Sequence, residues 1–187
     1  MLLHEIPTFG AGGTIHVVVE SPRGSTVKLK YDCHLGALTL SRALPAGLTY
    51  PHDWGFVPST HASDGDPIDA LVLSDVGTAP GVVIACRPIG VLEIEQNRRR
   101  GSGRERNDRI IAVPQGVARF DSLRDVADLS ERMRAEIVEF FVHASAFEEK
   151  GLKVLGWSGP DGALALVGRG DRQATAPGGA SRRAASR

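Results

Sequence analysis

The stretch YPHDWGFVPSTHASDGDPIDALVL, residues 50–73, joins a group of three carboxylates to a strand pattern. Its end, DALVLS, is a short apolar run of the kind found in buried strands. Similar short runs recur on both sides of it, bounded by Gly, Pro, Asp or Ser, at residues 14–20, 27–31, 37–42, 81–95 and 109–114. Several short strands at close spacing predict a mainly β protein built on a closed or nearly closed barrel.

One segment has helical periodicity instead. Ser130 suits the N-cap position, and the apolar residues after it fall on one face of a helix over about residues 131–150. This face carries Met133, Ile137, Phe140, Phe141, Ala144 and Phe147. The pattern predicts one long amphipathic helix whose aromatic stripe packs on the barrel as core.

Length and composition limit the remaining possibilities. The 187 residues suffice for one domain with its own core, and 42% hydrophobic with 24% charged content is ordinary for a globular protein. Lys plus Arg equals Asp plus Glu at 22 each, so any electrostatic function must be local. No apolar run of membrane length and no signal-peptide pattern is evident, so a cytoplasmic protein is expected. Cys33 and Cys86 lie far apart and are expected to be reduced residues that pack.

Two segments read as poorly ordered. Residues 98–109, RRRGSGRERNDR, carry six arginines and predict a basic, flexible loop between strands. The last residues, DRQATAPGGASRRAASR, are small, polar and basic and show no apolar period. We therefore expect a single domain over residues 1–170 and a disordered basic tail over residues 171–187.

The octapeptide SDGDPIDA, residues 63–70, carries the chemistry. It places Asp64, Asp66 and Asp69 beside the turn-forming Gly65 and the stiff Pro67. Three like charges so close repel one another unless cations lie between them. Oxygen ligands are what a hard cation such as Mg²⁺ requires. The octapeptide alone is equally compatible with a solvated acidic turn.

The context of this octapeptide resembles a known family. Residues 50–73 are similar to the signature of family I soluble inorganic pyrophosphatases, in which an aromatic-Pro turn accompanies a D-G-D-P-x-D motif. The similarity continues in the same order through VVVESP, VKLKYD, LGALTLSR, CRPIGVLEI, IIAVP and EKGLKVLGW, and covers roughly residues 3–158. The resemblance implies a five-stranded OB-like closed barrel flanked by one long and one or more short helices. For bacterial members it also implies a homohexamer.

The resemblance further implies roles for individual residues. Asp64 and Asp69 match metal ligands, and Asp66 matches the group that accepts a proton from the attacking water. Tyr50 matches a tyrosine that shapes the site. The remaining matches are Glu20 as a ligand of further metals, and Lys28 and Arg42 as phosphate-binding cations. Read without the resemblance, Glu20, Lys28 and Arg42 are ordinary surface charges.

Several positions depart from the family pattern. Lys30 places a cation where the family has a glutamate, and Arg109 replaces a lysine by a planar fork, so both join the expected substrate-binding set. Asn107 stands at a metal-ligand aspartate, which leaves the neighbouring Asp108 as the expected replacement ligand. The other departures are Trp54 and Phe56 for two tyrosines, Gln96 or Asn97 for an aspartate, and Ala144 and Ser145 for a Tyr-Lys pair.

These observations support three functions. The first is hydrolysis of inorganic pyrophosphate with Mg²⁺ or Mn²⁺, either slowly or with preference for another phosphoanhydride. The second is a degenerate relative that binds a phosphorylated ligand or a partner without turnover. The third is an assembly or nucleic-acid module using the basic loop and tail, although arginines without interleaved aromatics are a weak nucleic-acid signal. No membrane association is expected.

Overall fold

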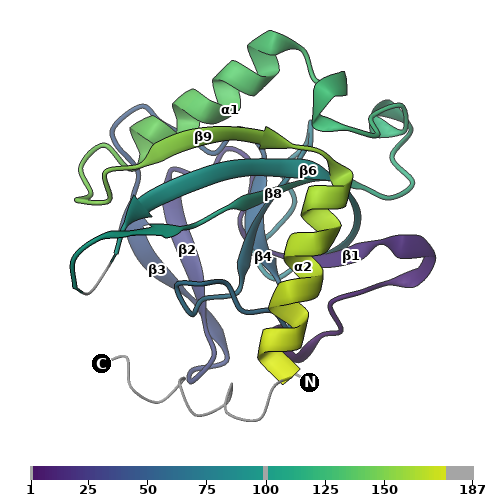
Figure 1. Ribbon diagram of the computed structural model, residues 1–187, viewed down its shortest axis with the longest axis horizontal. Helices are drawn as coiled ribbons and strands as arrows, with labels where there is room; N and C mark the ends of the chain where they lie inside the picture. The colour runs from purple at the N-terminus through teal and green to yellow at the C-terminus, as the bar shows by residue number, and fades with distance from the viewer. Residues whose placement is uncertain (1, 99–100, 176–187) are drawn as a thin grey trace.

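The computed structural model describes residues 2–98 and 101–175, and its centre is a closed ring of five strands (Figure 1). In spatial order these are β1 (Ile15–Ser21), β4 (Asp53–Val57), β5 (Ile68–Val72), β8 (Arg109–Pro114) and β6 (Val83–Asn97), and β6 pairs again with β1. Only β5 and β8 of this ring run parallel. The predicted five-stranded, OB-like barrel is confirmed.

Four further strands lie outside the ring. β2 (Val27–Asp32) and β3 (Ala37–Ala43) form a separate antiparallel hairpin. β7 (Arg104–Arg106) and β9 (Lys153–Ser158) both pair with the long strand β6. Short 3-10 turns occupy Leu3–Glu5, Ala11–Gly13, Ala118–Phe120 and Val126–Asp128. The strand β7 falls within residues 98–109, so the prediction of a flexible loop there was wrong for this part, because Gln96 and Glu105 lie opposite each other in a regular ladder.

Helix α1 (Glu131–Ala144) packs across the upper side of β9 and β6 in Figure 1. The Ser130 hydroxyl caps it by accepting a hydrogen bond from Met133 N, as predicted. The helix ends earlier than the predicted residue 150, because the chain turns after Ser145. Phe147 consequently lies 89% exposed, which contradicts its predicted place in the core stripe.

A second helix, α2 (Pro160–Thr175), crosses the sheet on another side and was not predicted individually. It is longer than α1, so the predicted long helix is the shorter of the two. It also continues past the domain end expected at Gly170, and the rest of the predicted tail lies outside the described residues. No helix in residues 2–98 and 101–175 is long and apolar enough to cross a membrane.

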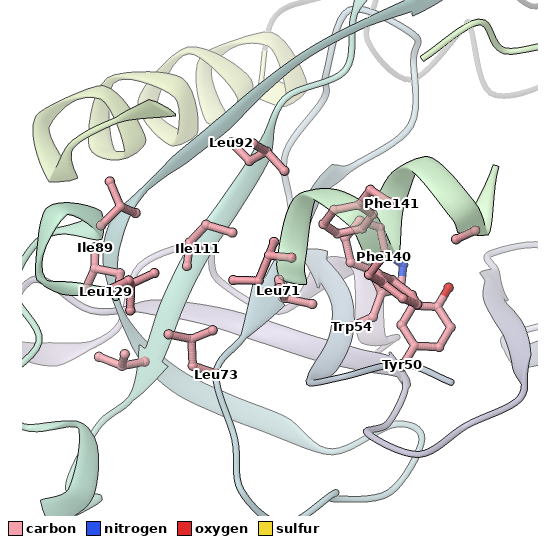
Figure 2. Close-up of a cluster of buried hydrophobic side chains, with 14 of the residues drawn as sticks. Tyr50, Trp54, Leu71, Leu73, Ile89, Leu92, Ile111, Leu129, Phe140 and Phe141 are labelled. Carbon is pink, nitrogen blue, oxygen red and sulfur yellow. The ribbon is translucent and has the colours of Figure 1, made fainter. Parts of the chain in front are cut away.

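Strand alternation divides the core between the two faces of the sheet. One face, with Ile15, Ala70 and Ile110, packs against Ala163 and Val167 of α2. The opposite face packs against α1, and Figure 2 shows Tyr50 and Trp54 lying beneath Phe140 and Phe141. Cys86 is buried and Cys33 partly buried, and both are free thiols, as expected. The α1 side of the sheet also carries the predicted site.

Candidate active site

The three aspartates are presented by a tight turn followed by a strand. Gly65 has φ of 85°, which a residue with a side chain adopts only with strain, and Asp66 N donates to Asp64 Oδ1 at 3.1 Å. The turn closes through Ala62 N, which donates to Asp66 O at 2.8 Å. Asp69 follows within β5, opposite Phe56 of β4. The turn therefore gathers two of the carboxylates and the strand sets the third beside them.

A β-bulge positions Glu20. The register of β1 against β4 shifts between Val19 and Ser21, which leaves Glu20 as the extra residue. At this point the strands come very close: a Cβ on Gly55 would lie 1.9 Å from Val18 O. Glu20 is 6% exposed, and its Oε1 accepts a hydrogen bond of 2.7 Å from Tyr31 N in the hairpin. The bulge thus turns a buried carboxylate toward β2.

The β2–β3 hairpin supplies the cations. Lys28 and Arg42 lie directly opposite each other, an arrangement in which like charges repel unless anions compensate them. Lys30, two residues further along β2, reaches the aspartate turn, with its Nζ 2.7 Å from Asp66 Oδ2. The departure from the family pattern at Lys30 therefore creates an ion pair with the predicted proton acceptor.

The Trp54 ring contacts two cations of the site, Lys28 of the hairpin and Arg109 of β8. It is 2% exposed, and its ring centroid lies 5.4 Å from the guanidinium carbon of Arg109 and 5.9 Å from Lys28 Nζ. Arg109 also lies 4.4 Å from the ring centroid of Phe141. Such contacts stabilise a positive charge withdrawn from water. Sequence reasoning treated Trp54 only as a tyrosine without its hydroxyl and missed this contribution.

Asp69 is the electrostatic centre of the group. Its charge acts on the pKa of side chains from several elements, namely Glu20, Lys28, Tyr50, Asp64 and Arg109. Burial raises the pKa of Glu20 to about 7, and Asp69 adds to the rise against the Tyr31 hydrogen bond. Burial, then Asp69 and Asp66, raises the pKa of Asp64 to about 6. Burial lowers the pKa of Lys28. The predicted residues therefore meet in one mutually perturbing cluster.

Tyr50 lies at the edge of this cluster, 4% exposed and stacked near Trp54 and Phe140. Burial raises the pKa of its phenol, so the hydroxyl stays neutral and can donate a hydrogen bond. Tyr50 also lines a cavity of about 310 Å³ with Arg23, His52 and Glu136. None of the other predicted site residues lines this cavity, so we do not assign it to the same site.

Asp108 does not point its carboxylate freely into the cluster. Its oxygens receive two hydrogen bonds of 3.0 Å from Arg106 and one of 2.9 Å from Ile94 N. Arg104 likewise pairs with Glu95. Carboxylates close to them in the sequence, Glu95 and Asp108, therefore bind both Arg104 and Arg106.

Two residues that sequence reasoning gave no role join the cluster from the loop after α1. Glu148 forms ion pairs with Arg42 and with Lys150. The only sequence signal is the run EEKG directly after the helical pattern, at the start of a segment that resembles the family. Ala144 and Ser145, which replace a Tyr-Lys pair of the family, lie at the end of α1. Ala144 is buried in the core, and the Ser145 hydroxyl donates a hydrogen bond to Phe141 O.

The donor set suits a divalent cation with oxygen ligands. Burial and the charge of Asp69 raise the pKa of Asp64, and carboxylates in such a partly buried place gain from a shared hard cation. Gln96, opposite Glu105 in the β6–β7 ladder, is 2% exposed, and its amide oxygen has no hydrogen-bond partner within residues 2–98 and 101–175. In the same ranges no three acidic, His or Cys side chains already converge as a complete ligand set. Water molecules would have to complete the coordination shell.

Fold and cluster together define a class: a closed five-stranded barrel that holds carboxylates against partly or fully buried cations on its α1 side. Comparison with known proteins gives the family. Residues 17–174 match the family model described as inorganic pyrophosphatase, and the chain belongs to this family.

Individual relatives agree with this assignment. The chain is 38% identical over 167 residues to an inorganic pyrophosphatase of Synechocystis, covering 89% of this chain and 95% of the relative. It is 41% identical over 156 residues to that of Thermus thermophilus, covering 82% and 86%. The crystal structure of a Thermus thermophilus inorganic pyrophosphatase superposes with a TM-score of 0.86 at 37% identity, covering 94% of this chain and all of the other.

Proposed function

We propose that this chain hydrolyses inorganic pyrophosphate to two phosphates, with water as the nucleophile. The observation that carries the proposal is the electrostatic cluster around Asp69, in which the buried Glu20 and three partly buried aspartates face the buried Arg109 and the partly buried Lys28 and Arg42. A substrate with several negative charges requires the cations, and an attacking water requires activation near neutral pH. Membership of the inorganic pyrophosphatase family supports the same reaction.

Each side chain has a defined task in this reaction. Lys28, Arg42 and Arg109 bind the phosphate oxygens of the substrate. Asp66 accepts the proton of the attacking water, and Lys30 orients the Asp66 carboxylate through their 2.7 Å contact. The proposal uses Tyr50 as a neutral donor at the edge of the site.

The proposed cofactor is Mg²⁺ or Mn²⁺. Asp64 and Asp69 would hold the ion, with Glu20 available to a further ion nearer the hairpin. When bound, such an ion neutralises phosphate charge and lowers the pKa of a coordinated water. Asp108 would serve as an additional ligand only after its oxygens leave Arg106.

The decisive measurement is phosphate release from pyrophosphate and from a panel of nucleotide and sugar diphosphates, with Mg²⁺ or Mn²⁺. We expect release from pyrophosphate, and a loss of about 10²- to 10⁴-fold in Asp66→Asn because the proton acceptor is removed. Asp75→Asn is the matched control, since Asp75 is exposed and pairs with the exposed Arg119. Background turnover by the unmodified chain on every substrate would contradict the proposal.

A second candidate is binding of a phosphorylated ligand without turnover. The observation in its favour is that Lys30 already binds an oxygen of Asp66. Pyrophosphate that binds in calorimetry but is never hydrolysed would select this candidate over the first.

We also propose that the chain forms a homo-oligomer, with a hexamer as the expected size. Large apolar side chains that stay exposed in the single chain, such as Val76 at 79% and Leu40 at 67%, support further burial. Sedimentation analysis tests this, and a monomer at micromolar concentration would overturn it.

A further inference from the structure

The loop between α1 and β9 places one carboxylate between two cations of the site. Glu148 Oε1 lies 2.5 Å from Arg42 Nη2, and Glu148 Oε2 lies 2.8 Å from Lys150 Nζ. The three side chains are 23% to 27% exposed, so water screens them only in part. The two oxygens of one anionic group thus bridge a guanidinium and an ammonium group.

A third cation makes the surroundings of Glu148 strongly positive. Lys28 faces Arg42 across the hairpin. Burial lowers the pKa of Lys28, and the positive charge of Lys150 lowers it further. The charges of Lys150, Arg42 and Lys28 lower the pKa of Glu148 although burial opposes this. Glu148 therefore lies in the field of three cations: Arg42 and Lys150 contact it directly, and Lys28 is shared with Asp69 and Glu20. The two contacting cations outnumber the one carboxylate between them, which leaves capacity for a more highly charged anion.

Hydrogen bonds from Asn97 fix the backbone of this loop, and the Lys150 side chain extends from it to its ion pair with Glu148. Asn97 N donates to Lys150 O at 2.7 Å, and Asn97 Nδ2 donates to Glu149 O at 3.0 Å. Gly151, with φ of 48°, allows this approach, since a Cβ there would lie 2.8 Å from Asn97 Nδ2. The end of β6 thereby fixes where Lys150 can reach.

We propose that Arg42 and Lys150 form a two-cation site for one phosphate group of the substrate, and that the Glu148 carboxylate occupies this site until the substrate arrives. Carboxylate and phosphate oxygens accept the same charge-assisted hydrogen bonds from Arg and Lys, but a phosphate group of pyrophosphate brings more negative charge. The substrate therefore displaces Glu148. This inference rests on the proposed function, because it takes the ligand to be one end of a diphosphate.

Binding of methylenediphosphonate, a diphosphate that cannot be hydrolysed, tests the inference by calorimetry on the full chain at constant Mg²⁺. Lys150→Met removes a charge-assisted hydrogen bond and weakens binding by about ten- to a hundredfold. Lys150→Arg restores it to within a few-fold. Glu148→Gln removes the competing charge and tightens binding by about tenfold. Lys153→Met is the matched control: Lys153 is an exposed residue on β9.

Two outcomes overturn the inference. If the Lys150→Met variant binds methylenediphosphonate as tightly as the Lys153→Met control does, Lys150 has no role in binding. If the Glu148→Gln variant binds methylenediphosphonate as weakly as the Lys150→Met variant does, Glu148 only positions the cations and does not compete with the ligand. Far-UV circular dichroism checks that each variant is folded.

Failure of the proposed function gives a different result. If the unmodified chain releases no phosphate but its binding of methylenediphosphonate still depends on Lys150, hydrolysis fails and the two-cation site stands. If the chain hydrolyses pyrophosphate and the Lys150→Met variant binds the analogue as the unmodified chain does, the proposed function stands and the two-cation site fails.

Discussion

The β6–β7 hairpin and the Asp69 cluster are both rich in charge, but they are built in opposite ways. In the hairpin, Arg104 binds Glu95 and Arg106 binds Asp108, and both arginines lie near the surface. The carboxylates of Glu95 and Asp108 neutralise these two arginines, and water screens the pairs. Such pairs contribute little to stability and leave little attraction for a ligand.

In the cluster, Glu20 and Arg109 are buried far more deeply than the hairpin charges, although ion pairs such as Lys30–Asp66 and Arg42–Glu148 form there too. Burial raises the pKa of Glu20 and lowers that of Lys28, so both side chains lie where their charged forms are disfavoured. The comparison teaches that buried charge with a shifted pKa, and not the number of arginines, marks the place where a charged ligand is expected.

Among the variants that compare the two regions, removal of the charge at the centre of the cluster should have the largest effect. Asp69→Asn keeps the shape of the side chain but removes the charge that acts on the other groups. We expect kcat/KM for pyrophosphate to fall by about 10²- to 10³-fold, about 3 to 4 kcal/mol of transition-state stabilisation. Steady-state phosphate release measures this. A loss no greater than that of Asp75→Asn would show that the cluster is not the reacting centre.

The second effect concerns stability and pH in the metal-free chain. The pKa of Glu20 is about 7 when folded and near its ordinary value of 4.5 when unfolded. The folded state therefore holds the proton more tightly, and the stabilisation present below pH 4.5 is lost as pH rises through 7. The full loss is about 3 kcal/mol.

Urea unfolding in chelator at several pH values measures this effect. The free energy of unfolding should fall with rising pH more steeply for the unmodified chain than for Glu20→Gln. Parallel curves for the two proteins would mean that Glu20 is not strained by burial.

A third and smaller effect should follow from removing the cation at the aspartate turn. Lys30→Met abolishes the contact with Asp66, so the turn becomes more negative and should bind Mg²⁺ about tenfold more tightly, about 1.4 kcal/mol. Calorimetric titration with Mg²⁺ measures this, with Lys153→Met as the control. Unchanged or weaker Mg²⁺ binding would indicate that Lys30 supports the metal site.

The smallest effect is expected in the hairpin. Arg104→Gln should lower the free energy of unfolding by about 0 to 1 kcal/mol, because its ion pair with Glu95 is surface-exposed. It should change pyrophosphate hydrolysis by less than a few-fold. A loss of activity comparable to that of Asp69→Asn would show that the hairpin charges are as important for the reaction as the cluster.

Local pattern was sufficient for most of the secondary structure. Apolar runs between turn residues predicted the main strands, and Ser130 predicted the start of α1. The end of α1 was wrong, since Phe147 continues the helical period but only chain reversal after Ser145 decides whether it is buried. Local pattern did not predict β4, β7 and β9 as strands. β6 supplies the hydrogen-bond partners of β7 and β9, and β1 and β5 supply those of β4.

For this protein, the sequence by itself determined the barrel-like strand pattern and the aspartate turn, because these depend on local periodicity and on a contiguous motif. Resemblance to the family, and not local pattern, pointed to Glu20, Lys28 and Arg42. Only the tertiary structure decided which charges meet. It turned Asp108 toward Arg106, brought Lys30 to Asp66, and added Glu148 and Lys150 to the site. Electrostatic coupling depends on distance in space, and distances between a hairpin, a bulge and a loop are set by packing.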